Sequence, residues 1–134
     1  MNTKDLSSSK VLAEEATKFL LEKQALDVRM YDLREREAIT DFYVNVTGKS
    51  ATHVSALADE LCDKISELGR NALRVEGKRT DAWILVDYGD LIVNVFDKQS
   101  RDFYNLDRLM PAGSLVDIEP LVAEVDSKFE IKKI

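Results

Sequence analysis

The chain has 134 residues, a net charge of −6 and a composition that is 45% hydrophobic and 33% charged. This length suits one domain with a real core, and no apolar run approaches the roughly 20 residues that a membrane-spanning helix needs. Acidic residues outnumber basic ones, which disfavours direct binding to RNA or DNA because such proteins need a basic face. We therefore expect neither a membrane nor a nucleic acid as a partner; a basic protein suits the charge better.

The N-terminus and the cysteine content both point to the cytoplasm. Residues 1–9 lack an apolar core and include an acid, so they fit neither a signal peptide nor a transit peptide. Cys62 is the only cysteine, which excludes an internal disulfide and suits a reducing compartment. We expect a cytoplasmic protein in which residues 1–9 are a lead-in to the domain.

Hydrophobic periodicity predicts two helices and three strands in the first part of the chain. The predicted helices span residues 10–23 and 51–68, and the predicted strands span residues 27–33, 39–47 and 72–76. Three consecutive serines before the first helix offer caps for it, and a glycine at position 69 ends the second.

The most apolar stretch of the chain is expected to form the centre of the sheet. It contains two runs typical of strands, at residues 82–86 and 91–96. Between them lies the tight turn Asp87-Tyr88-Gly89-Asp90. Gly89 accepts a positive φ and Tyr88 resists one, which favours a turn with these two residues at its centre. This geometry places the Tyr88 ring at an exposed loop tip.

The last part of the chain predicts one short helix and a tail. Residues 97–110 carry apolar side chains at positions 103, 106 and 110, a spacing typical of a short helix packed on the sheet. Pro111 and Gly113 end this helix, and residues 111–134 form either a further helix or a loose tail. The element order α-β-β-α-β-β-β-α predicts a single domain of α/β (mixed α+β) class, a mixed sheet flanked by helices.

Two patterns with catalytic associations have simpler structural explanations. The Gly-Lys-Ser sequence ending at Ser50 resembles the end of a phosphate-binding loop, but that motif needs a glycine where this chain has Tyr43. We expect Ser50 to cap the second helix instead. His53 and Cys62 lie more than two turns apart on the same predicted helix, so they cannot act as a pair.

Asp87 and Asp90 suggest a metal site or acid-base chemistry. A metal site needs further oxygen ligands, and Glu76 and Asp81 are the only nearby candidates. Turn formation explains both aspartates more simply, so we expect no catalytic residue, no metal site and no cofactor. A nucleotidyltransferase-like enzyme that holds Mg²⁺ with Asp87, Asp90 and Glu76 is kept as an alternative.

Trp83, Tyr88 and Tyr104 allow two interpretations. They could fill the core, or they could anchor a protein interface, as aromatic residues at strand edges and loop tips often do. Exposed aromatic rings could also join two copies of the chain. A homodimeric adaptor is therefore a second alternative.

These residues belong to motifs that resemble the ribosome silencing factor family, also called Iojap-like. The resemblance covers residues 10–110 and rests on Thr40–Val44, Thr47–Ser50, His53–Val54, Ala58–Asp59, Val75–Gly77, Trp83, Val86–Asp90, Val93–Phe96 and Arg101–Leu106. Two positions depart from the family pattern. Asn94 stands where the family often has histidine, and Met110 stands where it often has an aromatic residue such as tryptophan.

The resemblance implies a mixed five-stranded sheet similar to the nucleotidyltransferase fold, without its catalytic carboxylates. It implies binding to ribosomal protein L-fourteen on the large subunit, a block to docking of the small subunit, and less translation when nutrients are short. Residues 10–110 would form this Iojap-like domain, and residues 111–134 a C-terminal tail. The expected partner-binding surface consists of Trp83, Asp87, Tyr88, Asp90, Tyr104, Leu106 and Met110.

Overall fold

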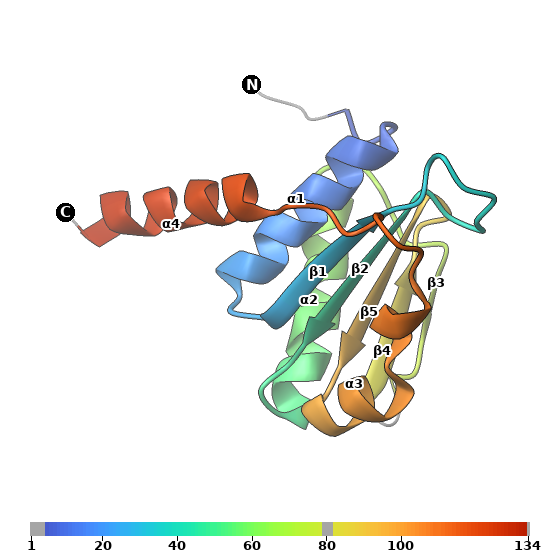
Figure 1. Ribbon diagram of the computed structural model, residues 1–134. Helices are drawn as coiled ribbons and strands as arrows, with labels where there is room; N and C mark the ends of the chain where they lie inside the picture. The colour runs from blue at the N-terminus through green and yellow to red at the C-terminus, as the bar shows by residue number, and fades with distance from the viewer. Residues whose placement is uncertain (1–4, 79–81, 134) are drawn as a thin grey trace.

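The computed structural model describes residues 5–78 and 82–133. Its elements are α1 (Ser9–Glu22), β1 (Leu26–Asp32), β2 (Phe42–Thr47), α2 (Ala51–Glu67), β3 (Arg74–Glu76), β4 (Trp83–Asp87), β5 (Leu91–Phe96), α3 (Lys98–Tyr104), the 3₁₀ turn η1 (Leu106–Leu109) and α4 (Glu119–Lys133) (Figure 1). The predicted element order is confirmed up to α3. None of the helices in the described part of the chain is long and apolar enough to cross a membrane.

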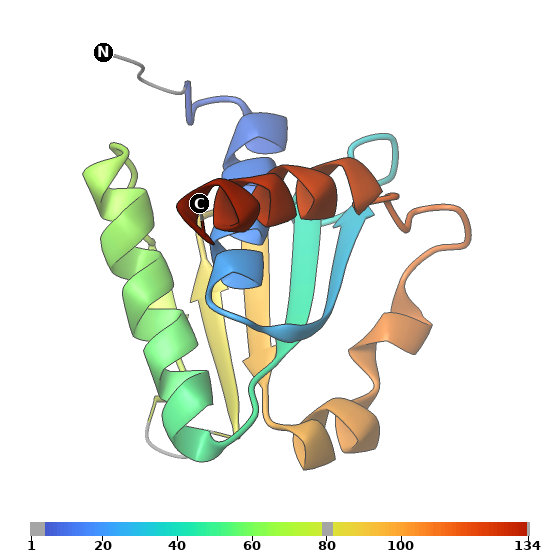
Figure 2. The ribbon, with the colours of Figure 1, turned by 90° about the vertical axis from the view of Figure 1, so that its left-hand side faces the viewer.

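The strands form one mixed five-stranded sheet in the order β1-β2-β5-β4-β3. β2 and β5 run parallel, and the other neighbouring strands run antiparallel. The predicted single domain with a mixed sheet and flanking helices is therefore confirmed. Figure 2 shows α2 and α3 on opposite sides of this sheet.

Strand alternation determines which side chains α1 and α2 cover. Ile84 and Val86 of β4 and Tyr88, the residue that follows it, lie on the same face of the sheet, and all three are buried in the core. The two helices meet this face with apolar residues at helical spacing. These residues are Leu12, Ala16 and Leu20 of α1 and Val54, Leu57, Leu61 and Ile65 of α2.

The opposite face of the sheet is only partly covered, and we call it the open face. α3 and η1 lie over it. Asn45, Asn94 and Phe96 on this face are buried, whereas Trp83 and Leu85 are half-buried. The open face therefore offers side chains to the solvent at β4.

Within the described part of the tail, residues 119–133 form the helix α4, one of the two forms that the sequence allows. The chain first passes along the edge of β1, where Leu115 forms an isolated antiparallel bridge with Tyr31. α4 then packs across α1. Val125 is buried in this contact, and the Lys18 ammonium lies 2.7 Å from a Glu124 carboxylate oxygen.

Ser50 caps α2 as the sequence predicts. Its hydroxyl oxygen accepts a hydrogen bond from the backbone N–H of His53 at 3.1 Å. We expect Ser50→Ala to lower the free energy of unfolding by about 1 kcal/mol, because one N–H of the first turn loses its acceptor. Urea denaturation measures this, with Thr52→Ala at an exposed site on the same helix as the control. Equal losses in both variants would contradict the capping role.

The prediction that Tyr88 lies at the centre of the β4–β5 turn is wrong. Its backbone N–H donates to the Leu91 carbonyl at 2.8 Å, so Gly89 and Asp90 are the two central residues. Gly89 carries the positive φ, +92°, which glycine adopts without strain. Tyr88 therefore continues the strand alternation, and its ring is buried against the helices.

The short helix predicted within residues 97–110 is confirmed as α3, but it does not reach position 110. α3 ends at Tyr104. Asn105, which has a φ of +46°, follows it and separates it from the turn η1. Phe103 does not pack on the sheet, since its side chain is 77% exposed. The second strand is shorter than expected and begins at Phe42 rather than Ile39.

Candidate functional site

Four aromatic side chains gather on the open face where β4 begins and β5 ends. We call Trp83, Phe96, Phe103 and Tyr104 the aromatic cluster. The Trp83 ring stacks on Phe96 at a centroid distance of 5.1 Å and lies 4.9 Å from the Tyr104 ring. Phe103 meets Tyr104 edge-on at 5.0 Å. Phe96 is buried, Trp83 is half-buried and Tyr104 is 47% exposed, so the cluster extends from the core to the surface.

Local sequence rules bring these rings together. Trp83 and Phe96 are direct partners across the antiparallel β4–β5 pair, and alternation places both on the open face. Asp97 follows β5 and caps α3, since its carboxylate accepts a hydrogen bond from the Ser100 N–H at 2.7 Å. The helix that starts there returns Tyr104 to the Trp83 ring.

A chain of hydrogen bonds extends from the aromatic cluster across the sheet. The Trp83 indole N–H donates to Asn94 Oδ1 at 2.9 Å, and Asn94 Nδ2 donates to Asn45 Oδ1 at 3.0 Å. Asn45 Nδ2 in turn donates to Asp107 Oδ1 at 3.1 Å. We call these four residues the polar relay. Both asparagines are completely buried, and the hydrogen bonds of the polar relay give the amide nitrogen and the amide oxygen of each a partner. Without these partners the amide groups would be costly to bury.

Asp107 is the charged end of the polar relay. Its carboxylate also accepts hydrogen bonds from the Tyr31 hydroxyl and from Arg101 Nε, both at 2.7 Å. Arg101 is buried, and its Nη1 donates to the Thr47 hydroxyl at 3.0 Å. Burial disfavours the charged form of Asp107, but the hydrogen bonds from Arg101, Tyr31 and Asn45 outweigh it and lower the pKa of this carboxyl. Burial and the bond to Asp107 raise the pKa of Tyr31 to about 12.

The lowered pKa of Asp107 makes part of the protein's stability depend on pH. The ordinary pKa, which applies to the unfolded chain, is 3.8, and the folded value lies below it. Ionised Asp107 therefore stabilises the fold fully above the unfolded pKa, and this contribution is lost as the pH falls through the folded value.

Asp107→Asn removes the group that titrates. We expect the difference in free energy of unfolding between this variant and the wild type to be constant above about pH 5 and to shrink below about pH 4. Urea denaturation across this range measures the difference. A difference that stays constant down to about pH 2 would show that Asp107 does not carry the effect.

A pocket lies beside Trp83 on the open face. Its volume is about 230 Å³, and Glu76, Gly77, Trp83 and Leu85 line it. Gly77 has a φ of +92°, and a Cβ there would lie 2.1 Å from the Trp83 carbonyl oxygen. Only glycine allows the chain to pass this close to Trp83, and the pocket leaves room for a partner side chain next to the indole.

The structure brings only part of the predicted surface together. Trp83 and Tyr104 are in contact, and Leu106 and Met110 are half-buried in the segment after α3. Tyr88 is only 2% exposed. The prediction of a displayed Tyr88 ring is therefore wrong, because alternation points it to the helix-covered face.

The two turn aspartates each pair with an arginine. Asp87 Oδ2 lies 3.1 Å from Arg74 Nε, and Asp90 Oδ1 lies 3.0 Å from Arg70 Nη2. Glu76 also pairs with Arg74, and the remaining candidate ligand, at position 81, lies outside the described residues. Within residues described here, no group of three His, Cys, Asp or Glu side chains could hold a metal ion. This geometry gives the Mg²⁺ alternative no support.

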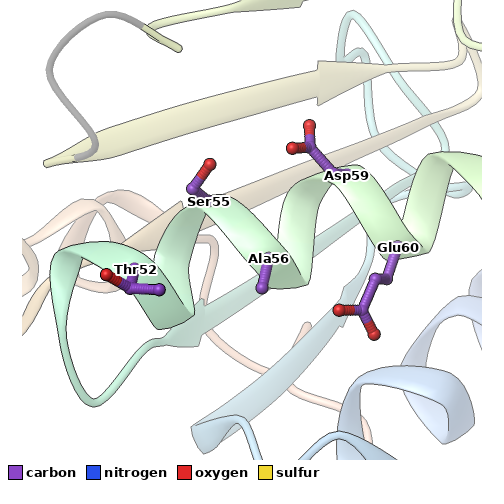
Figure 3. Close-up of a pocket in the computed structure, with 5 residues that line it drawn as sticks. All are labelled: Thr52, Ser55, Ala56, Asp59 and Glu60. Carbon is purple, nitrogen blue, oxygen red and sulfur yellow. The ribbon is translucent and has the colours of Figure 1, made fainter.

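A second hollow, of about 460 Å³, lies along the outer side of α2 (Figure 3). Its lining residues all come from this one helix and are Thr52, Ser55, Ala56, Asp59 and Glu60. Asp59 pairs with Lys78 at 2.6 Å, and Glu60 pairs with Lys23 at 3.4 Å. Since both acids have cationic partners and no aromatic ring lines the hollow, we place the candidate site at the aromatic cluster.

No sequence pattern predicts a role for Asn45, Arg101 or Asp107, and Asn94 stands out only as a departure from the family pattern. One signal was present for the asparagines. They stand inside apolar strands, and in the structure they are direct partners across β2 and β5. Arg101 and Asp107 carry no such signal, because charged residues near a short helix are usually exposed.

The fold and the aromatic cluster together define a class of protein. It is a single α+β domain whose mixed sheet is covered by helices on one face and displays aromatic rings on the other. A family model described as ribosomal silencing factor during starvation matches residues 6–133. The chain belongs to this ribosomal silencing factor family.

Individual relatives agree with this assignment. The ribosomal silencing factor of Bacillus subtilis is 34% identical over 98 residues, which are 73% of this chain and 83% of that protein. A crystal structure of a Bacillus halodurans protein has a TM-score of 0.69 and 32% identity, and the match covers 82% of this chain and 99% of that one. The chloroplast Iojap protein of Zea mays is 30% identical over 98 residues, 73% of this chain and 42% of that protein.

Proposed function

We propose that this protein binds the large ribosomal subunit through ribosomal protein L-fourteen and thereby prevents the small subunit from joining. In this role it represses translation in the cytoplasm when nutrients are short. The observation that carries the proposal is the aromatic cluster, displayed on the open face of a chain that belongs to the ribosomal silencing factor family.

The chemistry of the open face suits a protein partner. Tryptophan and tyrosine are the residues that most often dominate the binding energy of a protein interface, and Trp83 and Tyr104 are in contact here. Phe103 and Leu109 add exposed apolar side chains in the same segment of the chain. The net charge of −6 favours encounter with a basic ribosomal protein.

The mechanism is steric and needs no chemical step. A protein of this size that occupies the joining face of the large subunit excludes the small subunit from the same place. The aromatic cluster supplies affinity, and the rest of the domain supplies the bulk that blocks joining.

The proposal is tested with purified bacterial large subunits. We expect the protein to pellet with them through a sucrose cushion, to be displaced by free L-fourteen, and to lower the fraction of joined ribosomes when small subunits are added. Absence of pelleting, or pelleting with normal joining, would contradict it. A dimer in size-exclusion chromatography that Trp83→Ala converts to a monomer would instead assign the aromatic cluster to contact between two copies.

A further inference from the structure

Residues 98–110 lie on the open face although none of their apolar side chains is fully buried. The only buried residue of α3 is Arg101, and η1 has none. Phe103 and Leu109 are both mostly exposed. At about 25 cal/mol per Å² of apolar area removed from water, the half-buried side chains of Tyr104, Leu106 and Met110 hold the segment less firmly than fully buried ones would. The polar contacts of the buried Arg101 therefore add to these partial apolar contacts in fixing the position of the segment.

The Arg101–Asp107 ion pair closes a loop that presents Tyr104. Arg101 Nε lies 2.7 Å from Asp107 Oδ2, and Asn105, with a φ of +46°, turns the chain between them. Both charged residues also hydrogen-bond to side chains of β1 or β2. Tyr104 is thus fixed from both ends of its loop.

The polar relay connects Trp83 to the same carboxylate. Asp107 accepts a hydrogen bond from Asn45, Asn45 accepts one from Asn94, and Asn94 accepts the indole N–H. Hence one carboxylate is the common anchor for both the Trp83 ring and the loop that carries Tyr104.

We propose that Arg101 and Asp107 are positioning residues of the partner-binding surface, which hold Tyr104 against Trp83 so that the aromatic cluster is already assembled before a protein partner arrives. This inference deepens the proposed function and rests on it for the identity of the partner. The two residues act through the aromatic rings and need not touch the partner.

Preassembly has a clear energetic advantage. A loop that becomes ordered only on binding loses conformational freedom at that moment, and this loss is subtracted from the affinity. A buried ion pair is a weak source of stability, because desolvation of two charges offsets their attraction. Its geometry nevertheless fixes one arrangement of the segment. The benefit therefore appears in binding more than in the stability of the free domain.

The single tryptophan of the chain makes the inference directly measurable. In Asp107→Ala, the indole N–H resonance of Trp83 should shift and exchange faster with solvent, and acrylamide should quench its fluorescence about twofold more strongly. The affinity for large subunits should fall about tenfold, because the cluster must then order on binding. All measurements are made at a temperature at which circular dichroism shows the variant to be fully folded. Global unfolding then cannot cause the changes in exchange, quenching or affinity.

Asp102→Ala is the matched control. It removes a carboxylate from the same segment, but Asp102 is exposed and pairs only with Lys98, at 3.6 Å, among the contacts of the described residues. This variant should leave the indole signal, the quenching and the affinity unchanged. Asp107→Asn, which is nearly isosteric, gives the same readouts with smaller changes and replaces Asp107→Ala if that variant does not fold.

A double substitution shows whether Arg101 and Asp107 act together to position the aromatic cluster or contribute to binding independently. If Arg101 and Asp107 act as one unit, Arg101→Ala with Asp107→Ala should weaken binding no more than either single change. Unchanged indole exchange and quenching in a folded Asp107 variant would overturn the inference. If no form of the protein binds large subunits, the proposed function fails, while the tryptophan measurements still decide whether Asp107 positions the cluster.

Discussion

Tyr88→Ala is expected to lower the free energy of unfolding by about 3–5 kcal/mol. The Tyr88 side chain is among the largest that are fully buried, and it packs in the core between the sheet and the helices. Removal of the ring leaves a cavity that the surrounding side chains can fill only in part. Urea denaturation followed by circular dichroism measures the loss.

Tyr88→Phe is the matched control because it keeps the ring. The Tyr88 hydroxyl lies beside the Cys62 thiol, a weak hydrogen-bonding group, and finds no better partner among residues 5–78 and 82–133. Loss of this hydroxyl should change the free energy of unfolding by less than about 1 kcal/mol. A loss below about 1 kcal/mol in Tyr88→Ala would instead mean that the ring is exposed, as the turn sequence suggests.

The periodic elements of this fold could be predicted from the sequence. Apolar residues of α2 recur at helical spacing, and Ser50 and Gly69 mark its two ends. The sequence predicts the strand from Leu91 to Phe96 with its observed limits, because a turn precedes this short apolar run and a charged residue follows it. Patterns that span one element and need no distant partner were sufficient for these assignments.

The side chain of Tyr88 could not be placed from the same patterns. The turn sequence is compatible with either Tyr88 and Gly89 or Gly89 and Asp90 at its centre. This shift of one residue decides whether Tyr88 lies at the loop tip or continues the strand with its ring on the helix-covered face. The polar relay depends on a different kind of information. The bond between Asn45 and Asp107 joins residues 62 positions apart, so no local window contains it. The aromatic cluster could be predicted in part. The sequence marks Trp83 as a candidate interface residue, but only the folded chain shows its contact with Tyr104.

Trp83→Ala is expected to weaken binding to the large subunit by about 2 kcal/mol or more, which is roughly a thirtyfold rise in Kd. Trp83 is half-buried between Phe96 and Tyr104 and borders the pocket on the open face. Its loss removes the central ring of the cluster and leaves Asn94 Oδ1 without the indole donor. The fold should remain intact, because the helix-covered core does not include this side chain. Pelleting at several subunit concentrations measures the change.

Ile39→Ala is the matched control for an exposed apolar side chain, since Ile39 is 82% exposed. Ile39 precedes the first residue of β2. Trp83 pairs with Phe96, and Phe96 pairs with Thr47, which is the last residue of β2. At about 3.3 Å per residue, the two sites are separated by most of the sheet's length. Ile39→Ala should leave binding unchanged. Equal weakening in both variants would mean that general surface hydrophobicity, rather than the aromatic cluster, holds the partner.

Trp83→Phe separates the two contributions of the tryptophan. The variant keeps an aromatic ring in contact with Phe96 and Tyr104 but removes the N–H that Asn94 accepts. If buried area alone determines affinity, Trp83→Phe should lose only the small part of the binding free energy that corresponds to the smaller ring. We expect an intermediate loss of about tenfold, because the smaller ring is no longer oriented by the polar relay. A loss as large as that of Trp83→Ala would show that orientation of the ring, and not its area, determines how tightly the partner is held.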